Sequence, residues 1–198
     1  MTIFYEFEDN LYVNLTNRCP CACDFCVRNE GDGVGEGNNL WLQNEPTIDE
    51  IKQDFEKFDM SKYGEIVFCG YGEPLERIEE VVEIAKFIKE KTDKTIRINT
   101  NGLSDLIHNK PTAQMLKGAI DVVSISLNAP DAKTYDQRCH PSFGEKSFDA
   151  MLKFAKDCKS YVPKVILSVV DVIGDKEIEQ CRKIAEDIGV EYRVREFI

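Results

Sequence analysis

The sequence lacks any apolar stretch long enough to cross a membrane, which takes roughly 18 or more consecutive apolar residues. Residues 1–10 read MTIFYEFEDN and contain neither the basic nor the apolar part of a secretory leader, so we expect no leader. Internal repeats and low-complexity segments are absent as well. These absences exclude membrane-spanning and repeat architectures, and they favour a cytoplasmic protein with no membrane partner.

Basic residues are the minority among the charged ones. Lysine and arginine number 25 against 36 aspartates and glutamates, which gives a net charge of −11. A body of this charge repels nucleic acid and anionic membrane surfaces, so we expect no nucleic-acid partner. The 198 residues are 42% hydrophobic, enough for one core, and we expect a single domain over residues 1–198.

Apolar strands alternate with amphipathic helices along the chain. Short runs rich in Val, Ile and Leu are typical of strands covered on both faces, and segments with helical spacing of apolar residues lie between them. Strands are expected at 11–15, 65–69, 95–99, 121–127, 164–170 and 190–197, and helices at 47–58, 78–91, 112–118, 148–160 and 176–188. This alternation predicts an α/β fold with a parallel sheet and right-handed crossovers.

Four of the 8 cysteines lie within residues 19–26, directly after the first expected strand. In a reducing compartment such clustering indicates metal or redox chemistry rather than disulfides. Cys19, Cys23 and Cys26 follow the spacing C-x3-C-x2-C, and three thiolates on one loop can hold three irons of a 4Fe-4S cluster. The fourth iron would then be open to a small molecule.

The cysteines also allow interpretations other than an iron–sulfur cluster. A structural zinc site would combine Cys23 and Cys26 with a second pair such as Cys19 and Cys21, but zinc sites usually take that pair from a distant segment. The sequence has no second C-x2-C, and its two histidines are isolated. Cys21 is best interpreted as a spare thiol. Four scattered cysteines are expected to be packing residues: Cys69, Cys139, Cys158 and Cys181.

The cysteine run, with aromatic Phe25 just before Cys26, resembles the motif of the radical S-adenosylmethionine (SAM) enzymes. The resemblance implies a partial (β/α)6 TIM-like barrel, a 4Fe-4S cluster held by Cys19, Cys23 and Cys26, and SAM bound at the open iron. It also implies a one-electron donor of the ferredoxin or flavodoxin type. In this family, reductive cleavage of SAM gives a 5′-deoxyadenosyl radical that abstracts hydrogen from a substrate.

Further segments extend the resemblance over most of the chain. Residues 70–74, Gly-Tyr-Gly-Glu-Pro, resemble the family's Gly-Gly-Glu-Pro turn, with a tyrosine between the two glycines. Thr100 stands in a Thr-Asn-Gly segment, which an ordinary Asn-Gly turn explains equally well. Asn128 replaces the acid of the family's Ser-Leu-Asp. The resemblance implies SAM contacts at Phe25, Gly70, Gly72, Glu73, Pro74, Thr100, Ser126, Asn128, Val172 and Val194.

Candidate substrate contacts lie near the same end of the strands. Arg193 and Arg195 alternate to one face of the last strand, where they could bind an anionic substrate or the SAM carboxylate if that face is the barrel interior. Otherwise they would be solvated. Arg28, two residues after the last clustered cysteine, could neutralise the cluster or touch the substrate, with a surface ion pair as the alternative.

A glycine-rich loop at residues 30–46 separates the first strand from the first helix. Glycine at this density makes a mobile connection, and a radical reaction needs shielding from solvent. The loop is therefore a candidate lid. Asn39 and Trp41 at its end are candidate substrate contacts, although Trp41 could equally be a core anchor.

The substrate itself is not identified by these residues. The short barrel resembles 7-carboxy-7-deazaguanine synthases and glycyl-radical-enzyme activases, and the motifs are most similar to small stand-alone radical SAM proteins encoded beside TatD-type nucleases. A short barrel with little covering sequence leaves a wide opening, which suits a large substrate or a partner protein. Two alternatives remain: an activase-like protein acting on a protein partner, and a non-enzymatic iron–sulfur or zinc protein with Cys21 as fourth ligand.

Overall fold

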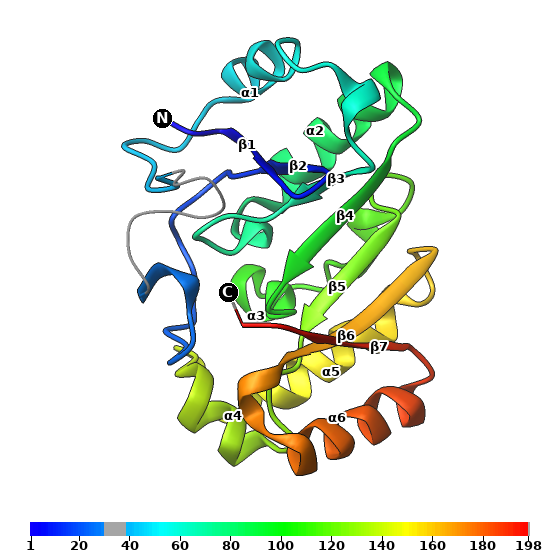
Figure 1. Cartoon of the computed structure of the whole chain (residues 1–198). Helices are drawn as coiled ribbons and strands as arrows, with labels where there is room; N and C mark the ends of the chain where they lie inside the picture. Colours follow the sequence, from blue (N-terminus) through cyan, green and yellow to red (C-terminus); the bar gives the residue numbers. More distant parts are fainter. Residues whose placement is uncertain (30–38, 198) are drawn as a thin grey trace.

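The computed structural model describes residues 1–29 and 39–197. Within them, seven strands form one sheet in the order β1-β2-β3-β4-β5-β6-β7 (Figure 1). The strands are β1 Phe4–Phe7, β2 Asn10–Val13, β3 Glu65–Phe68, β4 Thr95–Thr100, β5 Val122–Ser126, β6 Lys164–Val170 and β7 Glu191–Arg195. Neighbouring strands from β2 to β7 pair in parallel, which confirms the parallel sheet expected from the alternation.

Strand β1 is an addition that the sequence pattern did not predict. It pairs antiparallel with β2, with Phe7 opposite Asn10 across a two-residue turn. Glu8 in this turn has a φ of 50°, in the left-handed region. A hairpin turn of this length usually carries glycine or asparagine at such a position, so the usual signal is missing here.

Helices connect the parallel strands. They are α1 Ile48–Phe55, α2 Ile78–Lys91, α3 Ser104–His108, α4 Ala132–Cys139, α5 Lys146–Cys158 and α6 Asp175–Ile188, with short 3-10 helices η1 Val27–Asn29, η2 Met60–Lys62, η3 Pro74–Arg77, η4 Ala113–Leu116 and η5 Asp171–Ile173. Helices α3 and α4 were not predicted, and the expected helix at 112–118 is a 3-10 turn. Helix α1 begins at the expected capping box of Thr47 and Glu50, and α6 ends at Gly189, whose φ is 72°.

The main core lies between the outer face of the sheet and the helices. Ile66, Ile98 and Leu167 are among its fully buried strand residues, and α2, α3 and α5 lie behind the sheet in Figure 1. The inner face differs, since alternate positions of β4 to β7 carry several polar side chains there, while Tyr5, Tyr12 and Val67 form a small apolar cluster on β1 to β3. We call this inner side the lumen, and its polar lining includes Tyr12, Cys69, Arg97, Asn99, Ser124, Ser126, Ser168, Arg193 and Arg195.

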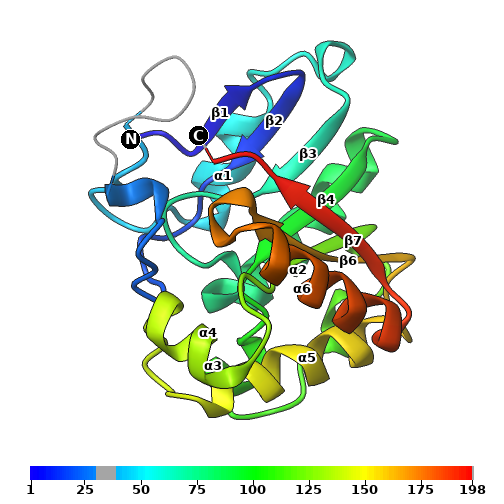
Figure 2. The same ribbon diagram turned by 60° about the horizontal axis from the view of Figure 1, so that its bottom comes forward.

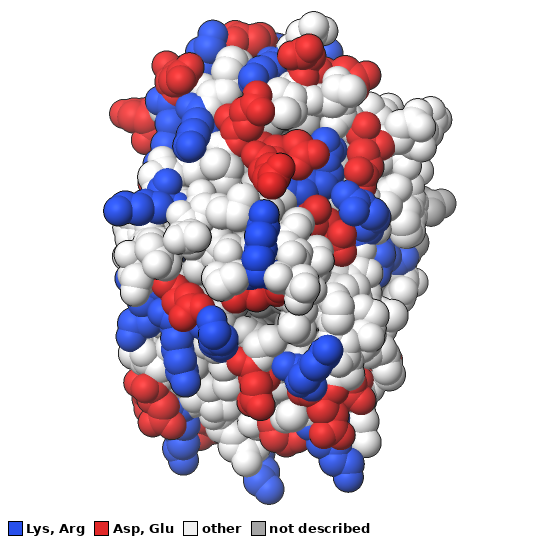
Figure 3. All heavy atoms as spheres, turned by 180° about the vertical axis from the view of Figure 1, so that it is seen from behind, with Lys and Arg blue, Asp and Glu red and all other residues white. Residues whose placement is uncertain are grey.

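Acidic and basic side chains are interspersed over the surface seen from behind (Figure 3). Such a mixture gives many exposed ion pairs, for example Lys52 with Glu83 at 2.8 Å, and each contributes little to stability. Among the described helices, none combines the length and the apolar character that a bilayer-crossing segment requires.

Candidate cluster and cofactor site

The cysteine loop follows β2 at the carboxyl end of the parallel strands, the end at which active sites form in β/α barrels. It runs to the end of α4, where Cys139 O accepts a hydrogen bond from Ala22 N at 3.0 Å and Arg138 O accepts one from Asp24 N at 3.0 Å (Figure 2). The backbone of the loop is therefore held by a helix more than a hundred residues further along the chain.

Polar side chains surround the cysteine sulfurs. Asn101 Nδ2 lies 3.9 Å from both Cys19 Sγ and Cys21 Sγ, and Arg28 Nε donates to Cys26 Sγ at 3.3 Å. Donors of this kind stabilise negative charge on sulfur. Asn101 was not among the predicted site residues, although it lies beside Thr100 in the Asn-Gly turn.

The thiols also contact one another. Hydrogen bonds from the thiols of Cys139 and Cys21 lower the pKa of Cys23 to about 4, although burial acts in the opposite direction. A hydrogen bond from Cys21 likewise lowers the pKa of Cys19. Cys139, expected to be a packing residue, is thus a neighbour of the cysteine loop, which its position in the sequence could not indicate.

This donor set fits an iron–sulfur cluster. The side chains of Cys19, Cys23 and Cys26 are all partly accessible, whereas Cys21 is 5% exposed. Thiolates are the donors that hold 4Fe-4S clusters. In residues 1–29 and 39–197, no three His, Cys, Asp or Glu side chains converge as the ligands of one metal ion would.

The turn after β3 presses directly against the chain that leads into the cysteine loop. A Cβ on Gly72 would lie 2.2 Å from Thr16 O, and a Cβ on Gly70 would lie 2.1 Å from Asn14 Oδ1. Glu73 N donates to Arg18 O at 2.7 Å. Both glycines are therefore required by the close approach of another segment.

The buried carboxylate of Glu73 joins two of these turns. It accepts hydrogen bonds from Thr100 Oγ1 at 2.7 Å, from Asn101 N at 2.7 Å and from Leu75 N at 3.0 Å. Burial nevertheless raises the pKa of Glu73 to about 7. Because the side chains of Glu73 and Thr100 bond to each other, Glu73 holds the turn after β3 to the turn after β4.

Ser126 and Asn128 lie at the end of β5. Ser126 is partly buried on the lumen side. Asn128 is buried with a φ of 53°, and its Oδ1 accepts from Val170 N at 3.3 Å. Arg138 Nη1 donates to Asn128 O and to Glu177 Oε2, both at 2.8 Å. Arg138 thereby holds the end of β5 to the start of α6.

The remaining predicted SAM contacts are dispersed. Phe25 packs partly buried against the main core, and Pro74 is buried at the start of η3. Val172 in η5 is 52% exposed. Val194 pairs with Val169 and so lies on the outer face of the sheet. Phe25 is part of the cysteine loop by its place in the sequence, whereas the structure does not bring Val194 into the lumen.

The segment that follows the glycine-rich loop lies beside the turn after β3. The ring centroids of Trp41 and Tyr71 are 5.0 Å apart, nearly edge to face, and Asn39 Oδ1 accepts a hydrogen bond from Trp41 N at 2.9 Å. Most of the predicted lid, residues 30–38, lies outside the described residues.

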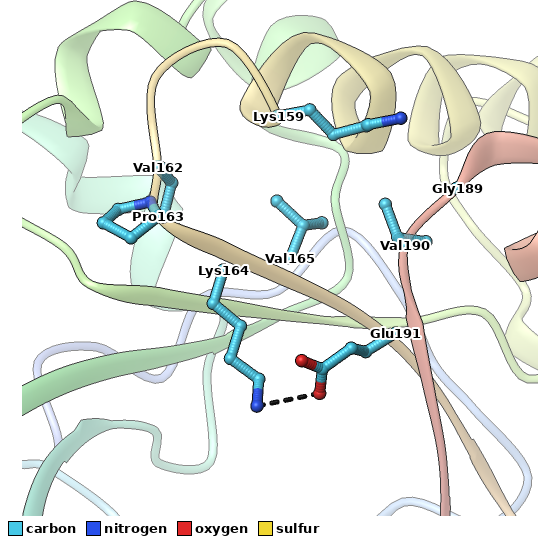
Figure 4. Close-up of a pocket in the computed structure, with 8 residues that line it drawn as sticks. All are labelled: Lys159, Val162, Pro163, Lys164, Val165, Gly189, Val190 and Glu191. Carbon is cyan, nitrogen blue, oxygen red and sulfur yellow. Dashed lines mark ion pairs between the residues drawn. The ribbon is translucent and has the colours of Figure 1, made fainter.

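A separate pocket of ≈ 420 Å³ lies at the opposite, amino ends of β6 and β7 (Figure 4). Lys164 and Glu191 form an ion pair of 2.8 Å at its edge, and Val165 and Val190 line it. None of the predicted site residues borders this pocket, so it does not belong to the cysteine site.

Comparison with known proteins gives a consistent assignment. The model of the radical SAM superfamily matches residues 13–188. A probable GTP 3′,8-cyclase of Methanocaldococcus jannaschii is 30% identical over 190 residues, which are 96% of this chain and 59% of that protein. A probable dual-specificity RNA methyltransferase RlmN of Rippkaea orientalis is 32% identical over 151 residues, 73% of this chain and 39% of that protein. The chain thus spans only part of the length of these relatives.

Solved structures share the fold. Streptococcus suis SuiB superposes with a TM-score of 0.70 at 16% identity, over 97% of this chain and 40% of SuiB. A radical SAM methyltransferase from Sphaerobacter thermophilus gives a TM-score of 0.66 at 15% identity, over 98% of this chain and 68% of that one. At such low identity the likeness concerns the fold, and it confirms the partial barrel.

Proposed function

The chain belongs to the radical SAM superfamily, and from this membership we propose that it is an enzyme that uses SAM and a 4Fe-4S cluster on a substrate not yet identified. The cluster would be held by Cys19, Cys23 and Cys26. The observation that carries the proposal is the position of these three thiols on one loop, at the carboxyl end of a partial barrel and against the Gly-Tyr-Gly-Glu-Pro turn.

When bound, the cluster supplies an electron for the reductive cleavage of SAM. The chain's own residues prepare the site for this chemistry. Arg28 donates to the sulfur of Cys26 and so stabilises its thiolate. Asn101 does the same for Cys19 at a longer distance. The carboxylate of Glu73 fixes the two turns beside them, so that their backbone groups meet a ligand in a preset arrangement.

Residues at the end of β5 are proposed to hold the ribose and carboxylate of SAM. Ser126 presents a hydroxyl on the lumen side, and Asn128 is fixed by Arg138 and by Val170 N. The electron donor would be a ferredoxin or flavodoxin. We propose no nucleic-acid or membrane partner, in line with the net charge of −11.

The test is anaerobic reconstitution with iron and sulfide, followed by electron paramagnetic resonance of the reduced protein with and without SAM. We expect a reduced 4Fe-4S signal that changes when SAM is added. A signal that ignores SAM, or a protein that takes up zinc in place of the cluster, would refute the proposal.

Cysteine variants separate this proposal from a non-enzymatic cluster protein. Cys19→Ala, Cys23→Ala and Cys26→Ala should each lose most of the bound iron. Cys21→Ala and Cys139→Ala are the matched controls, since Cys21 lies within the loop and Cys139 lies beside it. Both variants should keep the cluster and its response to SAM. Loss of the cluster in Cys21→Ala would instead identify Cys21 as a fourth ligand.

A further inference from the structure

Arg195 extends from β7 into the lumen, and no described residue forms an ion pair with it. The side chain is partly buried, and its Nε is fully buried with no hydrogen-bond partner among the described residues. Its charged or titratable neighbours are Cys69, Arg193, Arg97 and Tyr12. Tyr12 lies on β2 and Cys69 directly follows β3, both far from β7 in the strand order, so the Arg195 guanidinium faces them across the lumen.

None of these neighbours neutralises Arg195. Arg97 is already paired with Glu65 at 2.9 Å and donates to Asn99 Oδ1 at 2.8 Å. Burial raises the pKa values of Cys69 and Tyr12, so both groups are uncharged at neutral pH. Arg193 adds a second positive charge on the same face of β7. Within the described residues, the lumen therefore holds a local excess of positive charge in a protein whose net charge is −11.

A charged guanidinium with a buried N–H that lacks an acceptor is costly. The desolvation of such a charge destabilises the fold unless a counter-charge and hydrogen bonds compensate it. Arginine offers several donors in a planar fork that matches the oxygens of a carboxylate or a phosphate. An incoming anion would supply the acceptors that the chain does not.

We propose that Arg195, assisted by Arg193, anchors an anion site in the lumen that receives a carboxylate or phosphate group of a bound small molecule. The inference rests on the proposed function in that the lumen is taken as the substrate chamber. The lining hydroxyls of Ser124, Ser126 and Ser168 favour a polar ligand over an apolar one.

Inorganic phosphate is the probe. We would follow the thermal midpoint of the reconstituted protein as phosphate is added at constant ionic strength. The wild type should show a saturable rise, as expected for a ligand of the folded state. In Arg195→Gln the apparent affinity for phosphate should be lower than in the wild type by about tenfold or more. The affinity of Arg195→Lys should lie between those of the wild type and Arg195→Gln.

Arg182→Gln is the matched control, because Arg182 lies exposed on α6 and pairs with Glu179 at 3.3 Å. Its phosphate response should equal that of the wild type. A wild type without saturable stabilisation, or an Arg195→Gln variant that responds like the wild type, would overturn the anion site. Iron content shows that each variant has folded and loaded.

A second arm identifies the source of the anion by titrating SAM and 5′-methylthioadenosine, which lacks the amino-acid carboxylate. If Arg195 receives a substrate group, SAM affinity is unchanged in Arg195→Gln and phosphate binds alongside SAM. If Arg195 receives the SAM carboxylate, the affinity for SAM falls about tenfold in Arg195→Gln, and the affinity for methylthioadenosine does not change. Phosphate then competes with SAM. Both outcomes support the anion site. Since phosphate binding is also measurable without a cluster, a failure of the proposed function remains distinguishable.

Discussion

Gly72 is the residue at which the two halves of the site come closest. An alanine there would place its Cβ 2.2 Å from Thr16 O and 2.6 Å from Arg18 O. Both atoms are backbone, so no side-chain rotation relieves the overlap. We expect Gly72→Ala to lower the free energy of unfolding by about 2 kcal/mol or more, as measured by urea denaturation, and to reduce iron loading.

Gly64→Ala is the control for this prediction. Its Cβ would meet the side chain of Asn10 at 3.3 Å and no backbone atom closer than 3.6 Å. Gly64→Ala should therefore alter the free energy of unfolding and the iron content only slightly. Equal losses in the two variants would show that the close approach at Gly72 is not the cause.

Glu73 predicts a dependence of stability on pH. Its pKa is about 7 in the folded protein against an ordinary value of 4.5. Between these two pH values the folded state binds more protons than the unfolded state, so the unfolding free energy decreases as pH rises through this interval. The upper limit of the effect is about 3 kcal/mol, since one pKa unit corresponds to about 1.4 kcal/mol.

Glu73→Gln removes this titration while keeping the size of the side chain. Urea denaturation across the same pH interval should show that the unfolding free energy of the wild type decreases as pH rises. The decrease should be smaller in Glu73→Gln, so that the difference in unfolding free energy between the two proteins changes with pH. Parallel stability profiles would contradict the assignment. Loss of the hydrogen bonds to Thr100 and Asn101 would lower the stability of the variant at all pH values and leave this slope difference intact.

At the scale of elements, α4 is the support of the cysteine loop. Its last turn accepts hydrogen bonds from Ala22 and Asp24, and its Arg138 bonds to Asn128 O and Glu177. Arg138→Gln should lower the unfolding free energy by about 1–3 kcal/mol, since a partly buried charged bond is lost. Amide exchange in residues 19–26 should also become faster, as measured by mass spectrometry.

Lys57→Gln provides the comparison. The Lys57 side chain is 71% exposed and pairs with Asp54 at the end of α1, three residues earlier in the chain. Its removal should therefore change the unfolding free energy by less than about 0.5 kcal/mol. It should leave exchange in the cysteine loop unchanged. If Arg138→Gln behaves in the same way, α4 does not hold the loop through this residue.

Helix α4 also shows why the sequence predicted some elements and not others. The buried residues of α4 are Tyr135 and Cys139, one turn apart, so its apolar stripe is too narrow to stand out in a polar segment. Helices α2 and α6 bury a broader stripe and were predicted almost to the residue. The cysteine spacing and the Gly-Glu-Pro turn are local patterns and were likewise readable. The neighbours Asn101, Arg138 and Cys139 depend on tertiary contacts that no local pattern encodes.

At the scale of the whole molecule, the strands carry two different patterns. The outer face is apolar and forms the core with the helices, as expected from Ile66, Ile98 and Leu167. The inner face carries Arg97, Asn99 and a series of serines, so the sheet is not buried in apolar surroundings on both sides. A polar inner face is consistent with a chamber that binds a polar ligand.

The overall charge leads to a prediction about polyanions. A net charge of −11 repels a phosphate backbone along its length, while the positive groups Arg193 and Arg195 are only two charges on one face of β7. A fluorescently labelled single-stranded RNA should therefore bind more weakly than about 100 µM at physiological salt, the weak end of nonspecific affinities. Anisotropy measures this directly, and a small anion such as phosphate serves as the comparison. Tight RNA binding that weakens steeply with added salt would contradict the prediction.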